Sequence, residues 1–123
     1  MVIDSSALLA VFLKEPSGPW VIEQLEKNRH NLVMSIMNVT EVLIILRKYK
    51  WEHLNEIEKH VFTSEIKFLS PSLKEAEVAA ESRLKFPLNL GDCFAYALAK
   101  EKNLPILTLD QDFKKTDAEL IIP

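Results

Sequence analysis

The chain has 123 residues, of which 48% are hydrophobic, and this is enough for one domain, residues 1–123, with a core of its own. Its net charge of −3 counts mildly against a nucleic-acid-binding protein, although setting aside the four acids discussed below leaves basic and acidic side chains nearly equal in number. The one cysteine, Cys93, excludes an internal disulfide, and no apolar run approaches the roughly 18 residues that a membrane helix needs. We therefore expect a cytoplasmic protein with no signal peptide and no membrane contact.

Short apolar runs alternate with helical patterns along the whole chain. A strand at residues 1–4 is followed by a helix at 7–13, a break at 15–19, a second helix from Pro19 and a strand at 32–34. A long helix capped by Ser35 or Asn38 runs to about Lys50, and a further helix at about 51–64 precedes a strand at 66–69. Helices at 72–85 and 90–103 come before a strand at 106–109 and a short fifth strand at 120–122. This alternation predicts an α/β fold with a mostly parallel sheet of four or five strands, covered on both faces.

Four acidic residues stand where such a sheet presents its ligand-binding edge. Asp4 ends the first strand, Glu41 lies in the long helix, Asp92 opens the helix at 90–103, and Asp110 ends the strand at 106–109. Each has an ordinary explanation when taken alone. Asp4 can cap a helix, Glu41 can form a capping box with Asn38, Asp92 can interact with a helix dipole, and Asp110 can form an Asx-turn. All four together favour an acidic pocket that a hard divalent cation neutralises.

Other chemistries find little support in the sequence. With only Gly18 and Gly91, a glycine-rich phosphate-binding loop is excluded. The three histidines share no metal-ligand spacing and are expected to be solvated, and Cys93 is expected to be a small core residue.

The motifs around these acids resemble those of the PIN-domain ribonucleases, and in particular the small VapC-type toxins of prokaryotic toxin–antitoxin pairs. The resemblance covers essentially the whole chain and lies in Ile3-Asp4-Ser5-Ser6, Thr40-Glu41-Val42, Leu90-Gly91-Asp92-Cys93 and Thr108-Leu109-Asp110-Gln111-Asp112. Many relatives have Thr after the first Asp, where this chain keeps the hydroxyl as Ser5. The resemblance implies a three-layer α/β/α sandwich, Mg²⁺- or Mn²⁺-dependent endoribonuclease activity on RNA, homodimerisation and inhibition by a cognate antitoxin.

From these residues we derive a hypothesis for the site. Asp4 and Asp92 hold the main ion, while Glu41 and Asp110 bind directly or through water. One ion would activate the attacking water, and a second would stabilise the leaving oxygen. A second group of residues is expected to orient the carboxylates: Ser5, Ser6, Thr108 and Asp112. Asp112 is also an alternative to Asp110 as the fourth acid, and RNA contacts are expected from Arg47, Lys48 and Lys50.

Two other functions compete with a nuclease. A metal-free PIN-like interaction module would share the fold and the dimer but not the chemistry. A receiver domain of a response regulator has a similar length and an acidic Mg²⁺ pocket, but it needs paired acids after the first strand and a Lys after a late strand. The chain has Asp4 alone at the first position, and Leu69 is followed by Ser70-Pro71 rather than by an Asp.

Overall fold

The computed structural model describes residues 1–49 and 53–123. In chain order its elements are β1 (Val2–Ile3), α1 (Ser5–Phe12), α2 (Gly18–Lys27), β2 (Val33–Ser35), α3 (Ile36–Lys48), α4 (Leu54–Phe62), β3 (Lys67–Leu69), α5 (Leu73–Lys85), α6 (Leu90–Lys102), β4 (Ile106–Leu107), the 3₁₀-helix η1 (Gln111–Lys115) and β5 (Leu120–Ile121).

The five strands form one parallel sheet in the order β3-β2-β1-β4-β5. In the register, Val2 pairs with Val33 on one side and with Ile106 on the other. The expected parallel sheet is confirmed, including its short fifth strand. The strand order adds that β1, the first strand of the chain, lies at the centre.

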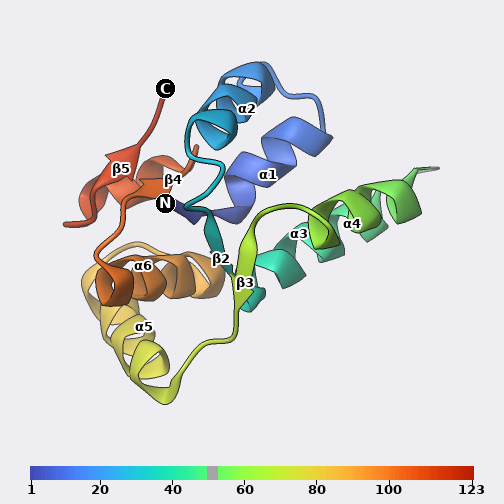
Figure 1. Ribbon diagram of the computed structural model, residues 1–123. Coiled ribbons are helices and arrows are strands. Elements are labelled where there is room, and N and C mark those ends of the chain that lie inside the picture. The colour runs from blue at the N-terminus through green and yellow to red at the C-terminus, as the bar shows by residue number, and fades with distance from the viewer. Residues whose placement is uncertain (50–52) are drawn as a thin grey trace.

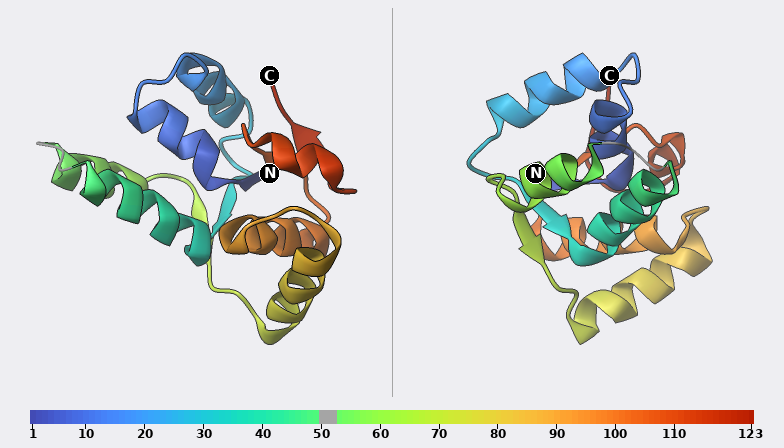
Figure 2. Two further views of the ribbon diagram at one scale, coloured as in Figure 1. Left: turned by 180° about the vertical axis from the view of Figure 1, so that it is seen from behind. Right: turned by 90° about the vertical axis from the view of Figure 1, so that its right-hand side faces the viewer.

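Helices cover both faces of this sheet and complete three layers (Figure 1). Successive residues of a strand point to opposite faces. Ile3 and Leu107 accordingly pack in one core with residues of α1, α2 and α3, whereas Val2 and Ile106 pack in a second core with α5 and α6. Figure 2 shows α5 and α6 on one side of the sheet and α1 and α2 on the other. The sheet is therefore buried on both faces, as a parallel sheet requires.

Local capping fixes where the helices near the sheet edge begin. Ser35 caps α3 by accepting a hydrogen bond from the amide of Met37 at 3.2 Å, so of the two expected caps Ser35 is correct and Asn38 lies inside the helix.

The helix expected at about 51–64 is described from Leu54, and residues 51–52, like Lys50, lie outside the described residues. Within the described ranges no helix is both long and apolar enough to cross a membrane.

The chain order of the strands creates a topological switch point at one edge of the sheet. From β1 the chain passes to β2 on one side, and it later returns to β4 on the other side. Such a switch point is where open α/β sheets bind ligands, next to the carboxyl ends of the strands. Asp4 follows β1 directly and Thr108 follows β4 directly, so both lie at this edge.

Candidate active site

Asp4 is buried at the carboxyl end of the central strand, with 1% of its surface exposed. It stands at the N-cap position of α1, but its side chain makes no capping hydrogen bond to that helix. Its Oδ2 instead accepts hydrogen bonds from Ser6 Oγ at 2.6 Å and Thr108 Oγ1 at 2.9 Å. Burial raises the pKa of Asp4 and the nearby Glu41 adds to this, while the two hydroxyl donors oppose it.

The same hydroxyl groups connect the ends of β1 and β4. Ser6 Oγ lies 3.2 Å from Thr108 Oγ1 and also accepts the amide of Leu109 at 3.0 Å. Thr108 Oγ1 accepts the amide of Asp110 at 3.0 Å. The backbone that carries Asp110 is therefore tied to the side chains that hold Asp4.

Asp110 and Asp112 differ in what their carboxylates contact. Asp110 caps η1, and its Oδ1 accepts the amide of Asp112 at 2.9 Å, which is the Asx-turn that the sequence left open as an explanation. The carboxylate of Asp112 lies 3.8 Å from the Lys115 ammonium group. Asp110 contributes to the raised pKa of Asp92, described below, and Asp112 is not among the causes of that shift.

Glu41 is half-buried on α3 and is held by two donors on one oxygen. Its Oε1 accepts hydrogen bonds from Ser5 Oγ at 2.9 Å and from Asn38 Nδ2 at 2.9 Å. The proposed capping box between Asn38 and Glu41 is wrong, because α3 begins at Ile36 and both residues lie within it. Ser5 Oγ is also 3.5 Å from Asp4 Oδ1, so it stands between two of the acids.

Asp92 lies in the first turn of α6 and is 4% exposed. Its amide donates to Asn89 Oδ1 at 2.8 Å, and its Oδ2 accepts the Asn89 amide at 3.3 Å, which completes a capping box. Burial raises the pKa of Asp92 to about 7, and repulsion from Asp4, Asp110 and Glu41 adds to the rise. The hydrogen bond from Asn89 opposes this rise, and the three other carboxylates are close enough to Asp92 to add to it.

The donor set of this place suits a hard divalent cation. Each carboxylate has one oxygen committed to hydrogen bonds. The other oxygens of Glu41, Asp92 and Asp110 have no hydrogen-bond donor in the part of the chain that the structure describes, and that of Asp4 has only the 3.5 Å contact with Ser5. Mg²⁺ prefers oxygen ligands and takes only one or two carboxylates directly, with water filling the remaining positions. Across residues 1–49 and 53–123, no three acidic, histidine or cysteine side chains stand close enough together to hold an ion between them. The arrangement therefore fits an ion with few direct ligands better than a closed cage.

One residue of this network was not expected from the sequence as part of the site. Asn38 is completely buried and donates both to Glu41 and to the carbonyl oxygen of Gly91 on α6, at 2.9 and 3.0 Å. The only signal in the sequence is a polar side chain one helical turn before Glu41 on an otherwise apolar helix.

The expected RNA-contacting residues lie toward the far end of α3. Arg47 Nε donates to Glu58 Oε1 of α4 at 3.0 Å, so this guanidinium is engaged within the protein. Lys48 is exposed, and Lys50 lies outside the described residues. Their contact with RNA stays a prediction. Cys93 is buried among apolar neighbours, as expected.

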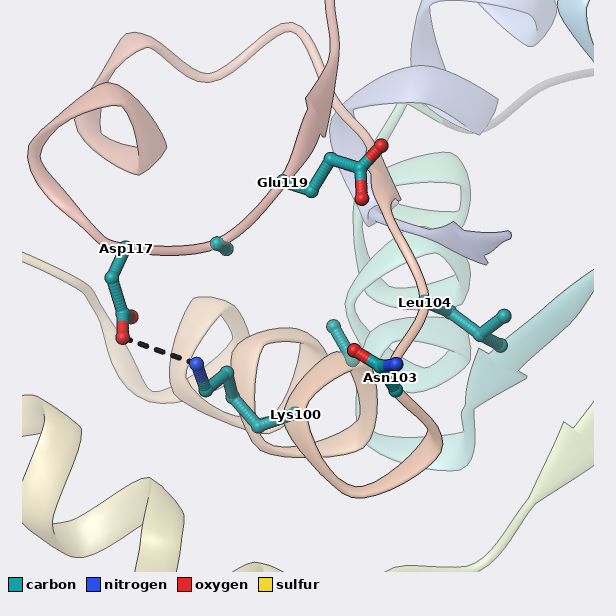
Figure 3. A pocket seen from close by; sticks show the side chains of 7 residues that line it. Lys100, Asn103, Leu104, Asp117 and Glu119 are labelled. Atoms are coloured by element: carbon teal, nitrogen blue, oxygen red, sulfur yellow. Dashed lines mark hydrogen bonds and ion pairs between the residues drawn. The ribbon is translucent and has the colours of Figure 1, made fainter.

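A polar pocket of about 150 Å³ lies at the opposite end of α6 (Figure 3). Lys100 and Asn103 line it from the helix, and Asp117 and Glu119 line it from the segment before β5. Figure 3 shows the Lys100 side chain reaching Asp117, with 3.1 Å between the two charged groups. Eight residues separate Asp92 from Lys100, about 12 Å along a helix, so this pocket is distinct from the acidic site.

Comparison with known proteins agrees with this geometry. The family model described as PIN domain matches residues 1–119. Ribonuclease VapC36 of Mycobacterium tuberculosis is 33% identical over 129 residues, covering 97% of this chain and 91% of that protein. Ribonuclease VapC30 of the same species is 27% identical, with 95% of each chain covered.

Solved structures give the same fold. The crystal structure of Mycobacterium tuberculosis VapC20, described as a sarcin-ricin loop cleaving toxin, matches with a TM-score of 0.80 at 14% identity, covering 99% of this chain and 98% of that one. A toxin–antitoxin complex from Klebsiella pneumoniae matches with a TM-score of 0.77 at 21% identity, covering 98% and 94%.

Fold and site together define an α/β protein with interacting acidic side chains at the carboxyl edge of a parallel sheet. The chain belongs to the PIN-domain family and, within it, to the VapC-type ribonuclease toxins. The fold class and the family expected from the sequence are confirmed, and the receiver-domain alternative is wrong.

Proposed function

We propose that this VapC-type ribonuclease cleaves RNA phosphodiester bonds with the help of a divalent cation, Mg²⁺ or Mn²⁺, and that residues 1–123 form one catalytic domain. The observation that supports the metal is the raised pKa of Asp92, about 7, which is caused first by burial and then by repulsion from Asp4, Asp110 and Glu41. Four carboxylates that repel one another destabilise a protein unless a cation or protons neutralise them.

In this proposal, Asp4 and Asp92 bind the cation directly. Both are almost completely buried, with 1% and 4% of their surfaces exposed. Glu41 and Asp110, which are half-buried, bind it directly or through water. A divalent cation at such a site lowers the pKa of a water nucleophile and stabilises charge on the leaving oxygen.

The surrounding residues orient the carboxylates. Ser6 and Thr108 donate to Asp4, and Ser5 donates to Glu41, so each acid directs its other oxygen away from these bonds. Hydrogen bonds of this kind fix the orientation of metal ligands, and their loss lowers metal affinity about 10- to 100-fold in other proteins.

Cleavage of a mixed RNA substrate by the purified protein tests the proposal. Asp4→Asn and Asp92→Asn should each abolish cleavage, and excess EDTA should do the same to the wild-type protein. Glu119→Gln, which removes an exposed carboxylate from the pocket at the other end of α6, is the matched control and should cleave normally. Undiminished cleavage by either Asn variant, or cleavage in EDTA, would contradict the metal site. A protein that folds, binds Mn²⁺ and cleaves nothing would favour the silent interaction module.

A comparison of two neighbouring acids identifies the fourth ligand. Because Asp112 pairs with Lys115 and Asp110 acts on Asp92, Asp110→Asn should impair cleavage far more than Asp112→Asn. The reverse order of the two cleavage rates would assign the role to Asp112.

A homodimer is the assembly that α3 supports. The helix buries Val39, Val42 and Leu46 in the core, but Ile36 and Ile44, two turns apart on one face, remain 40% and 60% exposed. We expect this face to pack against a second copy in the cytoplasm. Sedimentation should give a dimer for the wild-type protein and a monomer for Ile44→Glu, and an unchanged dimer in the variant would place the interface elsewhere.

An antitoxin protein is the second expected partner. Several solved neighbours are toxin–antitoxin complexes, including the one from Klebsiella pneumoniae. We expect the product of a small reading frame next to this gene to bind the protein and to stop RNA cleavage at an equimolar ratio. Full cleavage in the presence of a stable complex would show that binding leaves the acidic site open.

A further inference from the structure

The buried side chain of Asn38 joins two helices at the acidic site. Its Nδ2 donates to Glu41 Oε1 at 2.9 Å on its own helix, α3. The same Nδ2 donates to the carbonyl oxygen of Gly91 at 3.0 Å on α6. Gly91 directly precedes Asp92, so these two bonds link the carboxylate of Glu41 to the turn that carries Asp92.

Gly91 makes room for the Glu41 carboxylate. A Cβ atom at Gly91 would fall on the carboxyl group of Glu41, with all three of its carboxyl atoms as the nearest neighbours. No L side chain fits there unless Glu41 moves. The carboxylate of Glu41, one proposed ligand, therefore packs on the backbone of Gly91, which directly precedes Asp92, a second proposed ligand.

The other polar atom of Asn38 indicates that stability is not the reason for this residue. Asn38 Oδ1 is buried and has no hydrogen-bond partner among the described residues. A buried oxygen without a partner destabilises a fold. An apolar side chain of similar size would avoid this cost. Both acceptors of Nδ2 also have other donors, since Glu41 Oε1 accepts from Ser5 and the Gly91 carbonyl lies in the first turn of α6, where it faces the amide four residues on.

We propose that Asn38 is a positioning residue for Glu41. It holds the carboxylate of Glu41 over Gly91 and thereby sets its place relative to Asp92, against the repulsion between the two groups. This inference rests on the proposed metal-dependent function. It assigns to Asn38 an effect on cation affinity that passes through Glu41 and does not depend on the stability of the fold.

Two measurements on each variant separate these effects: thermal unfolding of the metal-free protein, and the Mn²⁺ dissociation constant by isothermal titration calorimetry. Asn38→Leu should unfold within a few degrees of wild type and bind Mn²⁺ about 10- to 100-fold more weakly. Asn28→Leu is the matched control, because within the described residues Asn28 Nδ2 donates to the Gln24 carbonyl oxygen of α2 and to no acid of the site. It should bind Mn²⁺ like the wild type.

A double variant tests whether the effect passes through Glu41. If Asn38 acts only by positioning that carboxylate, adding Asn38→Leu to Glu41→Gln should weaken Mn²⁺ binding no further. If Asn38→Leu weakens Mn²⁺ binding by the same factor in the wild-type and in the Glu41→Gln protein, the proposal is overturned. Mn²⁺ affinity within twofold of wild type in Asn38→Leu would overturn it as well.

Gly91→Ala provides an independent route should Asn38→Leu fail to fold. It displaces Glu41 while leaving Asn38 in place, and it should cause a similar loss of Mn²⁺ affinity. Unchanged affinity in Gly91→Ala would overturn the proposed contact. Failure of the wild-type protein itself to bind Mn²⁺ would instead overturn the metal-dependent function, which distinguishes the two failures.

Discussion

The substitution Asp92→Asn removes one charge from the acidic site while preserving the shape of the side chain. An amide at this position can still accept the hydrogen bond from the Asn89 backbone, so the start of α6 should remain intact. The native pKa of Asp92 is about 7, against an ordinary value of 3.8. The ionised carboxylate therefore destabilises the metal-free fold.

The sign and size of this effect follow from proton linkage. Because the native pKa is raised, the folded state binds the proton more tightly than the unfolded chain between about pH 4 and pH 7. Native stability falls as the pH rises through this window and is then constant. At about 1.4 kcal/mol per pKa unit, the full shift corresponds to as much as about 4 kcal/mol above pH 7.

Urea unfolding of the metal-free protein at pH 5 and pH 8 measures this prediction. Asp92→Asn should be more stable than wild type at pH 8, with a smaller gain at pH 5. Saturating Mn²⁺ should raise the stability of the wild type, by about 2.7 kcal/mol at 100 times the dissociation constant, and should raise that of Asp92→Asn much less. A variant less stable than wild type at pH 8, or one stabilised equally by Mn²⁺, would refute the reasoning.

Two further predictions concern residues around the sheet. Glu75 of α5 is buried, and burial together with Glu101 raises its pKa to about 7. Glu75→Gln should therefore increase the unfolding free energy at pH 8 and change it little at pH 5. An identical difference from wild type at both pH values in urea unfolding would contradict the raised pKa. Ser6→Ala removes a donor from Asp4 and a partner of Thr108, and calorimetry should show Mn²⁺ affinity about 10- to 100-fold lower; an unchanged dissociation constant would remove Ser6 from the site.

Much of the fold could be predicted because the elements follow local rules. Largely apolar runs of three or four residues between helical patterns predicted the strands, and their alternation with helices predicted a parallel sheet. The central place of β1 was beyond these rules, since periodicity gives no strand order. Asp4 and Asp110 could be placed at one edge because the carboxyl ends of parallel strands meet there.

The parts of the site that were missed depend on tertiary contacts. The fit of Glu41 against Gly91 exists only where α3 crosses α6, and residues 38 and 91 are far apart in sequence. The bond between Arg47 and Glu58 could not be predicted either, because it forms only where α4 packs beside the end of α3, and the contact of Arg47 with RNA stays a prediction. The capping explanation for Glu41 failed for a local reason, since Ser35 begins the helix one turn earlier than Asn38 would.

Crystallography of the protein soaked in Mn²⁺, with anomalous diffraction locating the ion, tests the central claim most directly. The account predicts a Mn²⁺ ion at the carboxyl edge between β1 and β4, coordinated directly by carboxylate oxygens of Asp4 and Asp92 and by water in the remaining positions. The contrary result would come from crystals saturated with Mn²⁺ and grown from protein that cleaves RNA. An ion bound elsewhere, or no ion between Asp4 and Asp92, would contradict the account.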